Sequence, residues 1–244
     1  MTAVSSERLL RAWEATVDEQ PLRRGISLLA SYRAADVRSV AEWSVLARDR
    51  ALYDLRCELF GAEAVAIASC PRCEEQLEVP LDLTVLRPPV DAGLPEPVHV
   101  DGYVATVRIP TTVDLQGIGD TADENSAVEA LVARCVDSIR GPDGKECGVH
   151  AAPTSVRSML RLHLAELLDD VDIELELRCA TCDREFAAPF DITPFLLREV
   201  EAWVATVLRD IHEIARAYGW DEPTILSLSP RRRRRYLDLI EASR

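Results

Sequence analysis

The sequence contains one short stretch twice, first as Cys70-Pro71-Arg72-Cys73 and again as Cys179-Ala180-Thr181-Cys182. In both copies a proline, an aspartate and a threonine follow the second cysteine at the same three spacings. Apolar residues alternate with other residues ahead of both copies, which is the period of a half-buried strand. Each copy is therefore predicted to form a strand, a cysteine turn (here called a knuckle), a second strand and then a turn or helix start at Asp-x-Thr.

Two C-x-x-C knuckles supply four thiolates, the full tetrahedral shell of a structural zinc site. The sequence predicts one zinc ribbon with the ligands Cys70, Cys73, Cys179 and Cys182. Cys73 and Cys179 are 106 residues apart, whereas a compact ribbon separates its knuckles by about 15–20 residues. The intervening segment must then be an insertion whose ends meet. Since each doubling of a loop adds only ~0.6 kcal/mol of closure free energy, this length is no obstacle.

Two other interpretations of the knuckles stay open, namely a pair of metal-free turns and a pair of redox dithiols. A thioredoxin-like dithiol would be expected to open a helix in a βαβ unit. The residues that follow both knuckles have the pattern of strands instead. The zinc ribbon is therefore the favoured interpretation.

Composition limits the function classes. The chain has 244 residues, seven cysteines and a formal net charge of −14. An odd number of cysteines with paired knuckles favours a metal over disulfides, and the acidic balance disfavours binding to a phosphate backbone. The sequence has neither an apolar run of membrane-spanning length nor a signal-peptide pattern at its start. We expect a cytoplasmic protein without a membrane span.

The predicted fold class is α+β, with helical regions before and after a small antiparallel sheet that carries the knuckles. Residues 1–61 form an N-terminal helical region, in which one long helix is expected to begin after Asp36 and reach Leu59. Residues 62–193 form the ribbon region, with a helical insertion at 123–168 and a hairpin turn at Asp101-Gly102. One amphipathic helix is expected over residues 123–140. Residues 194–244 form a C-terminal helical arm.

The C-terminal arm carries the expected partner-binding residues. Its apolar residues recur at intervals of three and four, as in a short heptad seam, and they are Val200, Val204, Val207, Ile211 and Ile214. Such a seam packs either on the chain's own helices or on a partner. A run of five arginines follows, namely Arg231, Arg232, Arg233, Arg234 and Arg235. Such a run is typical of nucleic-acid binding, but on a chain this acidic it fits equally well with docking to a carboxylate-rich surface, the protein's own included. We expect the arm to be the main partner-binding element.

No enzyme motif appears in the sequence. There is no nucleophile elbow, phosphate-binding loop or H-E-x-x-H pair. A catalytic zinc keeps one coordination position open, whereas four thiolates close the shell. We therefore predict a non-enzymatic protein without a small-molecule substrate.

Four stretches, taken in order, resemble a known family, the T-even-like phage baseplate proteins of contractile tails and related bacterial injection systems. They are Arg48-Asp49-Arg50-Ala51-Leu52-Tyr53-Asp54-Leu55-Arg56 continuing through Leu59-Phe60-Gly61 to the first knuckle, Val107-Arg108-Ile109-Pro110-Thr111-Thr112-Val113-Asp114-Leu115, the second knuckle with Pro189-Phe190-Asp191-Ile192, and Tyr218-Gly219-Trp220-Asp221-Glu222 with the helix that follows Ser229-Pro230. Many family members lack the paired cysteines, so the metal site is argued from this sequence alone.

The resemblance implies a structural or assembly role in a contractile-tail baseplate, with other baseplate or tail proteins as partners. The protein would then act in the cytoplasm or as part of an assembled particle, either a phage or an injection system. Two alternatives stay open. One is an assembly chaperone that is absent from the final particle. The other is a zinc-ribbon nucleic-acid binder that uses Arg231–Arg235.

Overall fold

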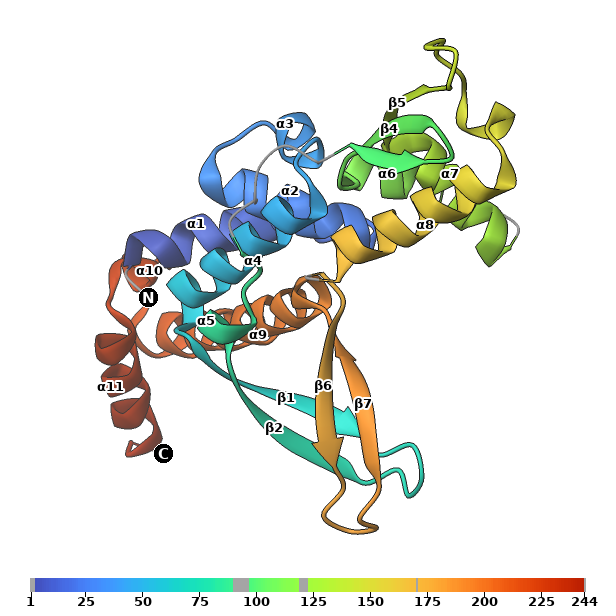
Figure 1. Ribbon diagram of the computed structural model, residues 1–244. Helices are drawn as coiled ribbons and strands as arrows, with labels where there is room; N and C mark the ends of the chain where they lie inside the picture. Colours follow the sequence, from blue (N-terminus) through green and yellow to red (C-terminus); the bar gives the residue numbers. More distant parts are fainter. Residues whose placement is uncertain (1–2, 90–96, 119–122, 170, 244) are drawn as a thin grey trace.

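The computed structural model describes residues 3–89, 97–118, 123–169 and 171–243. Figure 1 shows a body of helices from both ends of the chain, two long hairpins that leave it on one side, and a smaller α/β insertion. The mixed helix and antiparallel-sheet content confirms the predicted α+β class. No helix in the described ranges is both long and apolar enough to cross a membrane.

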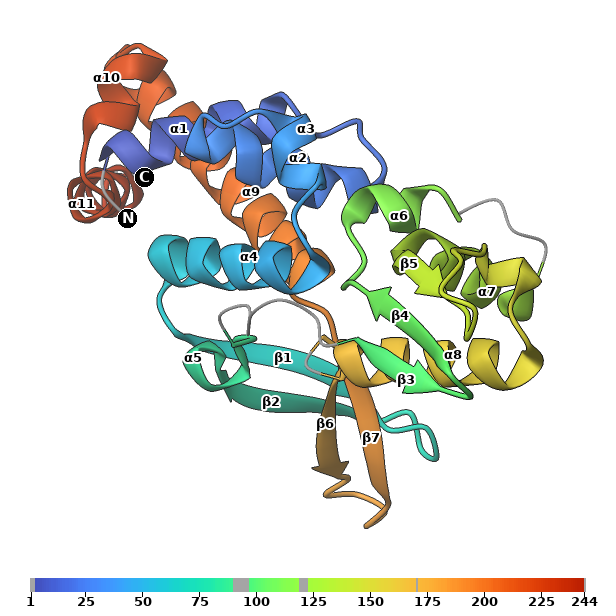
Figure 2. The ribbon, with the colours of Figure 1, turned by 45° about the horizontal axis from the view of Figure 1, so that its top comes forward.

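The helical body is built around the 27-residue helix α9. Helix α9 packs against α2, α4, α10 and α11, and Figure 2 shows it running through the middle of this group. The helices of the body are α1 (Ala3–Glu14), α2 (Pro21–Arg33), α3 (Val37–Ala41), α4 (Val45–Phe60), α9 (Ile192–Tyr218), α10 (Glu222–Ser227) and α11 (Pro230–Glu241). One hydrophobic core joins side chains from both ends of the sequence. The expected N-terminal and C-terminal helical regions therefore share a core.

The heptad seam of α9 lies inside that core. Its five members are at most 8% exposed; they are Val200, Val204, Val207, Ile211 and Ile214. The expectation that this seam binds a partner is wrong, because the chain's own helices already cover it. The same periodicity arises whether a helix packs on its own chain or on another, so the pattern predicted burial but not the neighbour.

Two predicted helices are interrupted. The helix expected from Asp36 to Leu59 is two helices, because the Ser44 hydroxyl accepts from the backbone N–H of Ala47 and starts α4 afresh. The helix expected over residues 123–140 ends at Cys135, and residues 136–140 form a strand. Tertiary pairing has overridden helix propensity there, since this strand completes a sheet with the preceding hairpin.

The insertion has a separate hydrophobic core. Its three-stranded antiparallel sheet has the order β3 (Val98–Val100), β4 (Tyr103–Val107), β5 (Val136–Arg140). Its helices are α6 (Thr112–Gln116), α7 (Glu124–Cys135) and α8 (Thr154–Leu168), with a 3₁₀ turn at Val149–Ala151. The predicted turn at Asp101-Gly102 joins β3 to β4, and both residues have positive φ, 51° and 76°, as a two-residue hairpin loop requires.

The knuckles lie on two separate hairpins and not on one small sheet. The first hairpin pairs β1 (Glu63–Ser69) with β2 (Gln76–Asp82), and the second pairs β6 (Ile173–Arg178) with β7 (Glu185–Phe190). Each hairpin is a two-stranded antiparallel sheet. Figure 1 shows the hairpins crossing, with their tips close together at the end away from the helices.

Candidate metal centre

The two knuckles have the same backbone structure. In the first, the N–H of Cys70 donates to the carbonyl of Glu75, and the N–H of Glu74 donates to the carbonyl of Cys70, both at 2.9 Å. In the second, Cys179 and Arg184, then Asp183 and Cys179, repeat these bonds at the same two distances. Glu74 and Asp183 also share a positive φ, 60° and 59°. The repeat seen in the sequence is therefore a repeat of hydrogen-bonded structure.

The equivalence continues to the end of each hairpin. The Asp82 carboxylate accepts from the N–H of Thr84 at 2.9 Å and starts the short helix α5 (Leu83–Leu86). The Asp191 carboxylate accepts from the N–H of Thr193 at 2.8 Å and starts α9. The prediction of a turn or helix start at Asp-x-Thr is confirmed in both copies. An aspartate at this position satisfies backbone donors that the helix itself leaves free.

The four predicted cysteines converge. The sulfur atoms of Cys70 and Cys182 are 3.6 Å apart, as are those of Cys73 and Cys179, and all four lie within 4.8 Å of one another. Zn–S bonds of about 2.3 Å would place tetrahedral sulfurs about 3.8 Å apart. The two pairs at 3.6 Å match that spacing closely, and no pair is more than 4.8 Å apart. All four cysteines are free thiols. The cluster is a possible metal site.

The four cysteines of the cluster differ in burial. Cys70 and Cys179, the first cysteine of each knuckle, are fully buried, whereas Cys73 is exposed and Cys182 is half-buried. The centre thus has an inner side toward the hairpins and an outer side at the tip. A metal ion bound by all four sulfurs would have no ligand position left for a substrate, as in a structural site.

The thiols perturb one another's ionisation. Burial opposes the ionisation of Cys70, but hydrogen bonds from the backbone N–H groups of Arg72 and Cys73 and from nearby thiols lower the pKa of Cys70 to about 6. A backbone hydrogen bond from Glu75 lowers the pKa of Cys73, yet burial and the three neighbouring sulfurs outweigh it and raise that pKa to about 12. Four thiolates so close together repel one another, and a bound cation would remove that repulsion.

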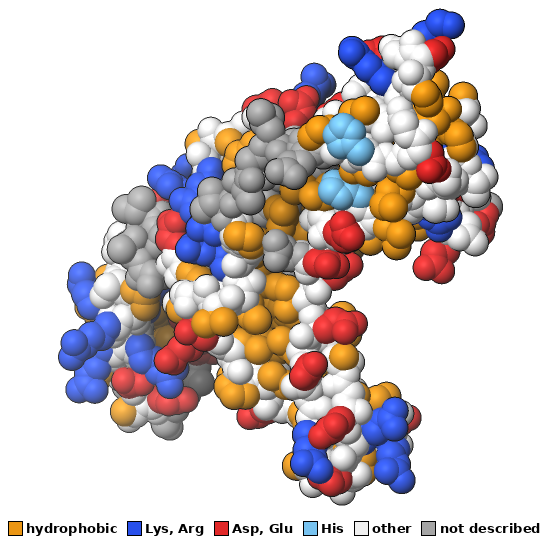
Figure 3. Space-filling view, viewed as in Figure 1, with side chains coloured by type: hydrophobic (Ala, Val, Ile, Leu, Met, Phe, Trp, Pro, Cys, Tyr) orange, Lys and Arg blue, Asp and Glu red, His pale blue; other side chains and the backbone are white. Residues whose placement is uncertain are grey.

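The arginine run is only partly available to a partner. Arg231, Arg232, Arg234 and Arg235 are exposed, and Figure 3 shows basic side chains gathered over the end of the molecule where α11 lies. Arg233, in contrast, is 3% exposed, since α11 turns that side chain toward α9. Burial lowers the pKa of Arg233, and the charge of Asp210 opposes that shift. The expectation of five partner-binding arginines is therefore wrong for Arg233.

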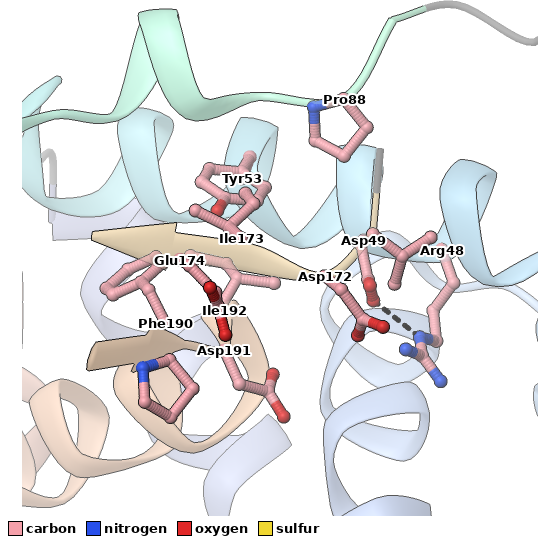
Figure 4. A pocket seen from close by; sticks show the side chains of 12 residues that line it. Arg48, Asp49, Tyr53, Pro88, Asp172, Ile173, Glu174, Phe190, Asp191 and Ile192 are labelled. Carbon is pink, nitrogen blue, oxygen red and sulfur yellow. Dashed lines mark hydrogen bonds and ion pairs between the residues drawn. The ribbon is translucent and has the colours of Figure 1, made fainter. Parts of the chain in front are cut away.

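A pocket that the sequence did not predict lies between α4, the start of β6 and the junction of β7 with α9. Its volume is about 520 Å³, and Figure 4 shows its lining side chains. Arg48, Asp49 and Tyr53 come from α4, and Asp172, Glu174 and Asp191 come from the second hairpin and its ends. No local pattern could have grouped these residues, because they come from segments more than a hundred residues apart.

Comparison with known protein families, with curated proteins and with solved structures finds no match for this chain.

Proposed function

We propose that this protein is a non-enzymatic structural or assembly component of a contractile phage-tail-like baseplate, stabilised by a structural zinc ion on Cys70, Cys73, Cys179 and Cys182. One observation carries the structural part of the proposal: two knuckles with the same backbone hydrogen bonds, 106 residues apart, bring four thiols within 4.8 Å of one another. Zinc is the metal that best fits four sulfur ligands in a tetrahedral arrangement.

A metal at this position would act as a cross-link. The first hairpin follows α4 directly, and the second leads directly into α9. Joining their tips would restrain two segments that are far apart in the sequence. The free energy of metal binding becomes free energy of folding when the site exists only in the folded chain. Such a rigid, closed element suits a protein that serves as a structural part.

The baseplate assignment is supported by the ordered resemblance of four sequence stretches. Within the second stretch, the Asp114 carboxylate accepts from Arg108 Nη1 at 2.6 Å and from the Thr111 backbone N–H at 2.8 Å. Residues of the first and third stretches, Tyr53 and Phe190, have their ring centroids 6.3 Å apart. Residues of these stretches thus form contacts that stabilise one fold. Contacts of this kind are compatible with a sequence pattern shared by a family.

The test is to express the neighbouring tail genes together with a tagged form of this chain and to purify the assembled particles. Mass spectrometry of the particles should detect the chain in a fixed ratio to baseplate proteins. Detection only in partial assemblies would identify the assembly chaperone instead. Absence from both, with no tail protein retained by the tagged chain, would contradict the proposal.

The exposed arginines of α11 favour one competing function, nucleic-acid binding, which the net charge of −14 opposes. A filter-binding assay at increasing salt separates the two. Binding through phosphates must weaken steeply as salt rises. We expect no such binding near physiological salt.

A further inference from the structure

The pocket between α4 and the second hairpin has an unusual charge. Arg48 is already occupied, since its Nε donates to the Asp49 carboxylate at 2.6 Å and its Nη1 donates to the Thr112 hydroxyl at 3.3 Å. That pair neutralises the buried end of the pocket. Asp172, Glu174 and Asp191 remain at the rim, and none of them forms an ion pair within the described residues. The rim therefore carries three carboxylates without an ion-pair partner among the described residues, of which Asp191 also accepts from the Thr193 N–H at the start of α9.

A buried hydroxyl lies at the same place. Tyr53 is 1% exposed, lines the pocket (Figure 4), and its hydroxyl has no hydrogen-bond partner among the described residues. Burial raises the pKa of Tyr53, and the carboxylates of Asp49 and Asp191 raise it further. A buried hydroxyl without a partner carries the full cost of its lost hydration. A ligand that donates to this oxygen would remove that cost.

The carboxylates do not suit a metal ion. In the described part of the chain they do not converge closely enough to hold one, unlike the four cysteines. They surround a larger space with apolar walls, including Ile173, Phe190 and Pro189. A planar cation with several donors matches such a space, because a guanidinium group has five N–H donors and is weakly hydrated. A lysine ammonium is compact and strongly hydrated, so it fits less well.

The backbone beside the pocket favours a peptide over a free small molecule. Strand β6 pairs with β7 on one side, and no described strand pairs with its other edge. Ile173 and Glu174 of β6 line the pocket. An open strand edge offers backbone donors and acceptors to an extended segment. Figure 3 shows acidic side chains along the concave border between the insertion and the hairpins, which would attract a basic segment.

We propose that this pocket binds the guanidinium group of an arginine side chain presented by an extended segment of a partner protein. The guanidinium donates to the Tyr53 hydroxyl oxygen and to the rim carboxylates of Asp172, Glu174 and Asp191, while its methylenes lie against the apolar walls. Helix α11 lies well away from the start of β6 in both ribbon views, so its arginines are not the occupant in cis (Figures 1 and 2). This inference rests on the pocket and holds whatever particle the protein belongs to.

The test uses the full-length, metal-loaded protein and a capped tripeptide, acetyl-Ala-Arg-Ala-amide, in an NMR chemical-shift titration. The comparison peptides carry lysine or citrulline, the latter being a neutral isostere of arginine. We expect saturable shifts at the amides of Tyr53, Asp172–Glu174 and Asp191 with the arginine peptide. Binding of the citrulline peptide should be at least about tenfold weaker, since it lacks the charge. Equal binding of both, or unsaturable shifts over the whole acidic surface, would overturn the proposal.

Two variants sharpen the result. Tyr53→Phe removes only the unpartnered hydroxyl, so the melting temperature should stay the same or rise while the arginine peptide binds several-fold more weakly. Asp172→Asn with Glu174→Gln should weaken binding and reduce its salt dependence. The charge-matched control, Glu176→Gln with Glu185→Gln, changes the same hairpin outside the pocket and should leave affinity unchanged. Unchanged affinity in Tyr53→Phe, or an equal loss in the control, would also overturn the proposal.

Discussion

Arg56 on α4 binds Glu199 on α9 through two parallel hydrogen bonds, Nε to Oε2 at 2.8 Å and Nη2 to Oε1 at 2.7 Å. The remaining nitrogen, Nη1, donates to the carbonyls of Gly61 and Glu63 at 2.6 and 2.8 Å. The Arg56 side chain is 3% exposed. One guanidinium therefore fastens the start of the first knuckle hairpin to the helix that follows the second. It works at the opposite end of the hairpins from the metal centre.

Replacing Arg56 should destabilise the protein markedly. We expect Arg56→Ala to lower the free energy of unfolding by about 3 kcal/mol, because a buried guanidinium and its hydrogen bonds to two carbonyls and a partly buried carboxylate are lost. Glu199→Gln should cost only about 1 kcal/mol, since the amide keeps part of the bonding. Urea titration measures both. The control is Arg33→Ala, whose pair with Glu58 is 43% and 45% exposed and should contribute less than about 1 kcal/mol. Similar losses for Arg56→Ala and Arg33→Ala would contradict this role.

Loss of a metal ligand should differ from loss of a core thiol. Cys179→Ser should abolish tight zinc binding and destabilise the fold by on the order of several kcal/mol. Cys135→Ser replaces a fully buried thiol of the insertion core, and it should cost about 1–2 kcal/mol without any loss of metal. Metal analysis of the purified proteins and thermal unfolding with and without a chelator separate the two. Equal thermal shifts, or a chelator that leaves the wild-type melting temperature unchanged, would argue against the metal cross-link.

The insertion should lose stability in acid through Asp114. Burial opposes its ionisation, but hydrogen bonds from Arg108 and from the backbone and side chain of Thr111 lower its pKa from 3.8 to about 2. Because the folded pKa lies below the unfolded one, this carboxylate stabilises the fold above about pH 4 and ceases to do so as the pH falls toward 2. Asp114→Asn should therefore be less stable than wild type at pH 7, with the difference shrinking between pH 4 and pH 2.

Melting temperatures measured from pH 7 to pH 2 test this prediction. Asp143→Asn removes a 59%-exposed carboxylate from a loop of the same insertion and controls for the lost charge. A constant difference between wild type and Asp114→Asn over the whole range would exclude the proposed linkage.

The seam residues of α9 should contribute to stability as core residues do. Ile214→Ala removes a fully buried side chain, and we expect a loss of about 2–5 kcal/mol from the transferred methyl groups and the cavity left behind. Leu208→Ala, on the same helix but 43% exposed, should cost less than about 1 kcal/mol. Denaturant unfolding of the two variants gives the comparison. If Ile214→Ala leaves stability unchanged, the seam is not held by the chain's own helices.

Local chemistry made part of this fold predictable. The two knuckles follow from their cysteine spacing, and the β3–β4 turn follows from Asp101-Gly102, because each depends on residues adjacent in sequence. The convergence of the knuckles could also be predicted, because two C-x-x-C pairs are a common ligand set for a single zinc ion. The strand at Val136–Arg140 could not, because it exists only through pairing with β4. The helices that cover the α9 seam could not be predicted either, since periodicity shows that a face is buried without showing what covers it.

The hydrogen bonds and ion pairs between distant segments could not be predicted from the sequence. Arg56 and Glu199 are 143 residues apart, and nothing near either one indicates the other. The pocket could not be predicted for the same reason. Tyr53 and Asp191 line one pocket only because the second hairpin packs beside α4 in the folded chain. Such sites depend on the path of the chain as a whole and emerge only from the folded structure.

The separation of the two knuckles in the sequence also means that the ribosome makes them at different times. When the ribosome has made Cys73, its neighbour Cys179 is still 106 residues away, which is roughly 5–20 s of translation. The insertion has its own core and has time to fold in that interval. During this time the thiols of Cys70 and Cys73 lack those of Cys179 and Cys182. A polypeptide released before Cys182 can never close the shell. A metal ion held by all four thiols would therefore mark chains that were translated past the second knuckle.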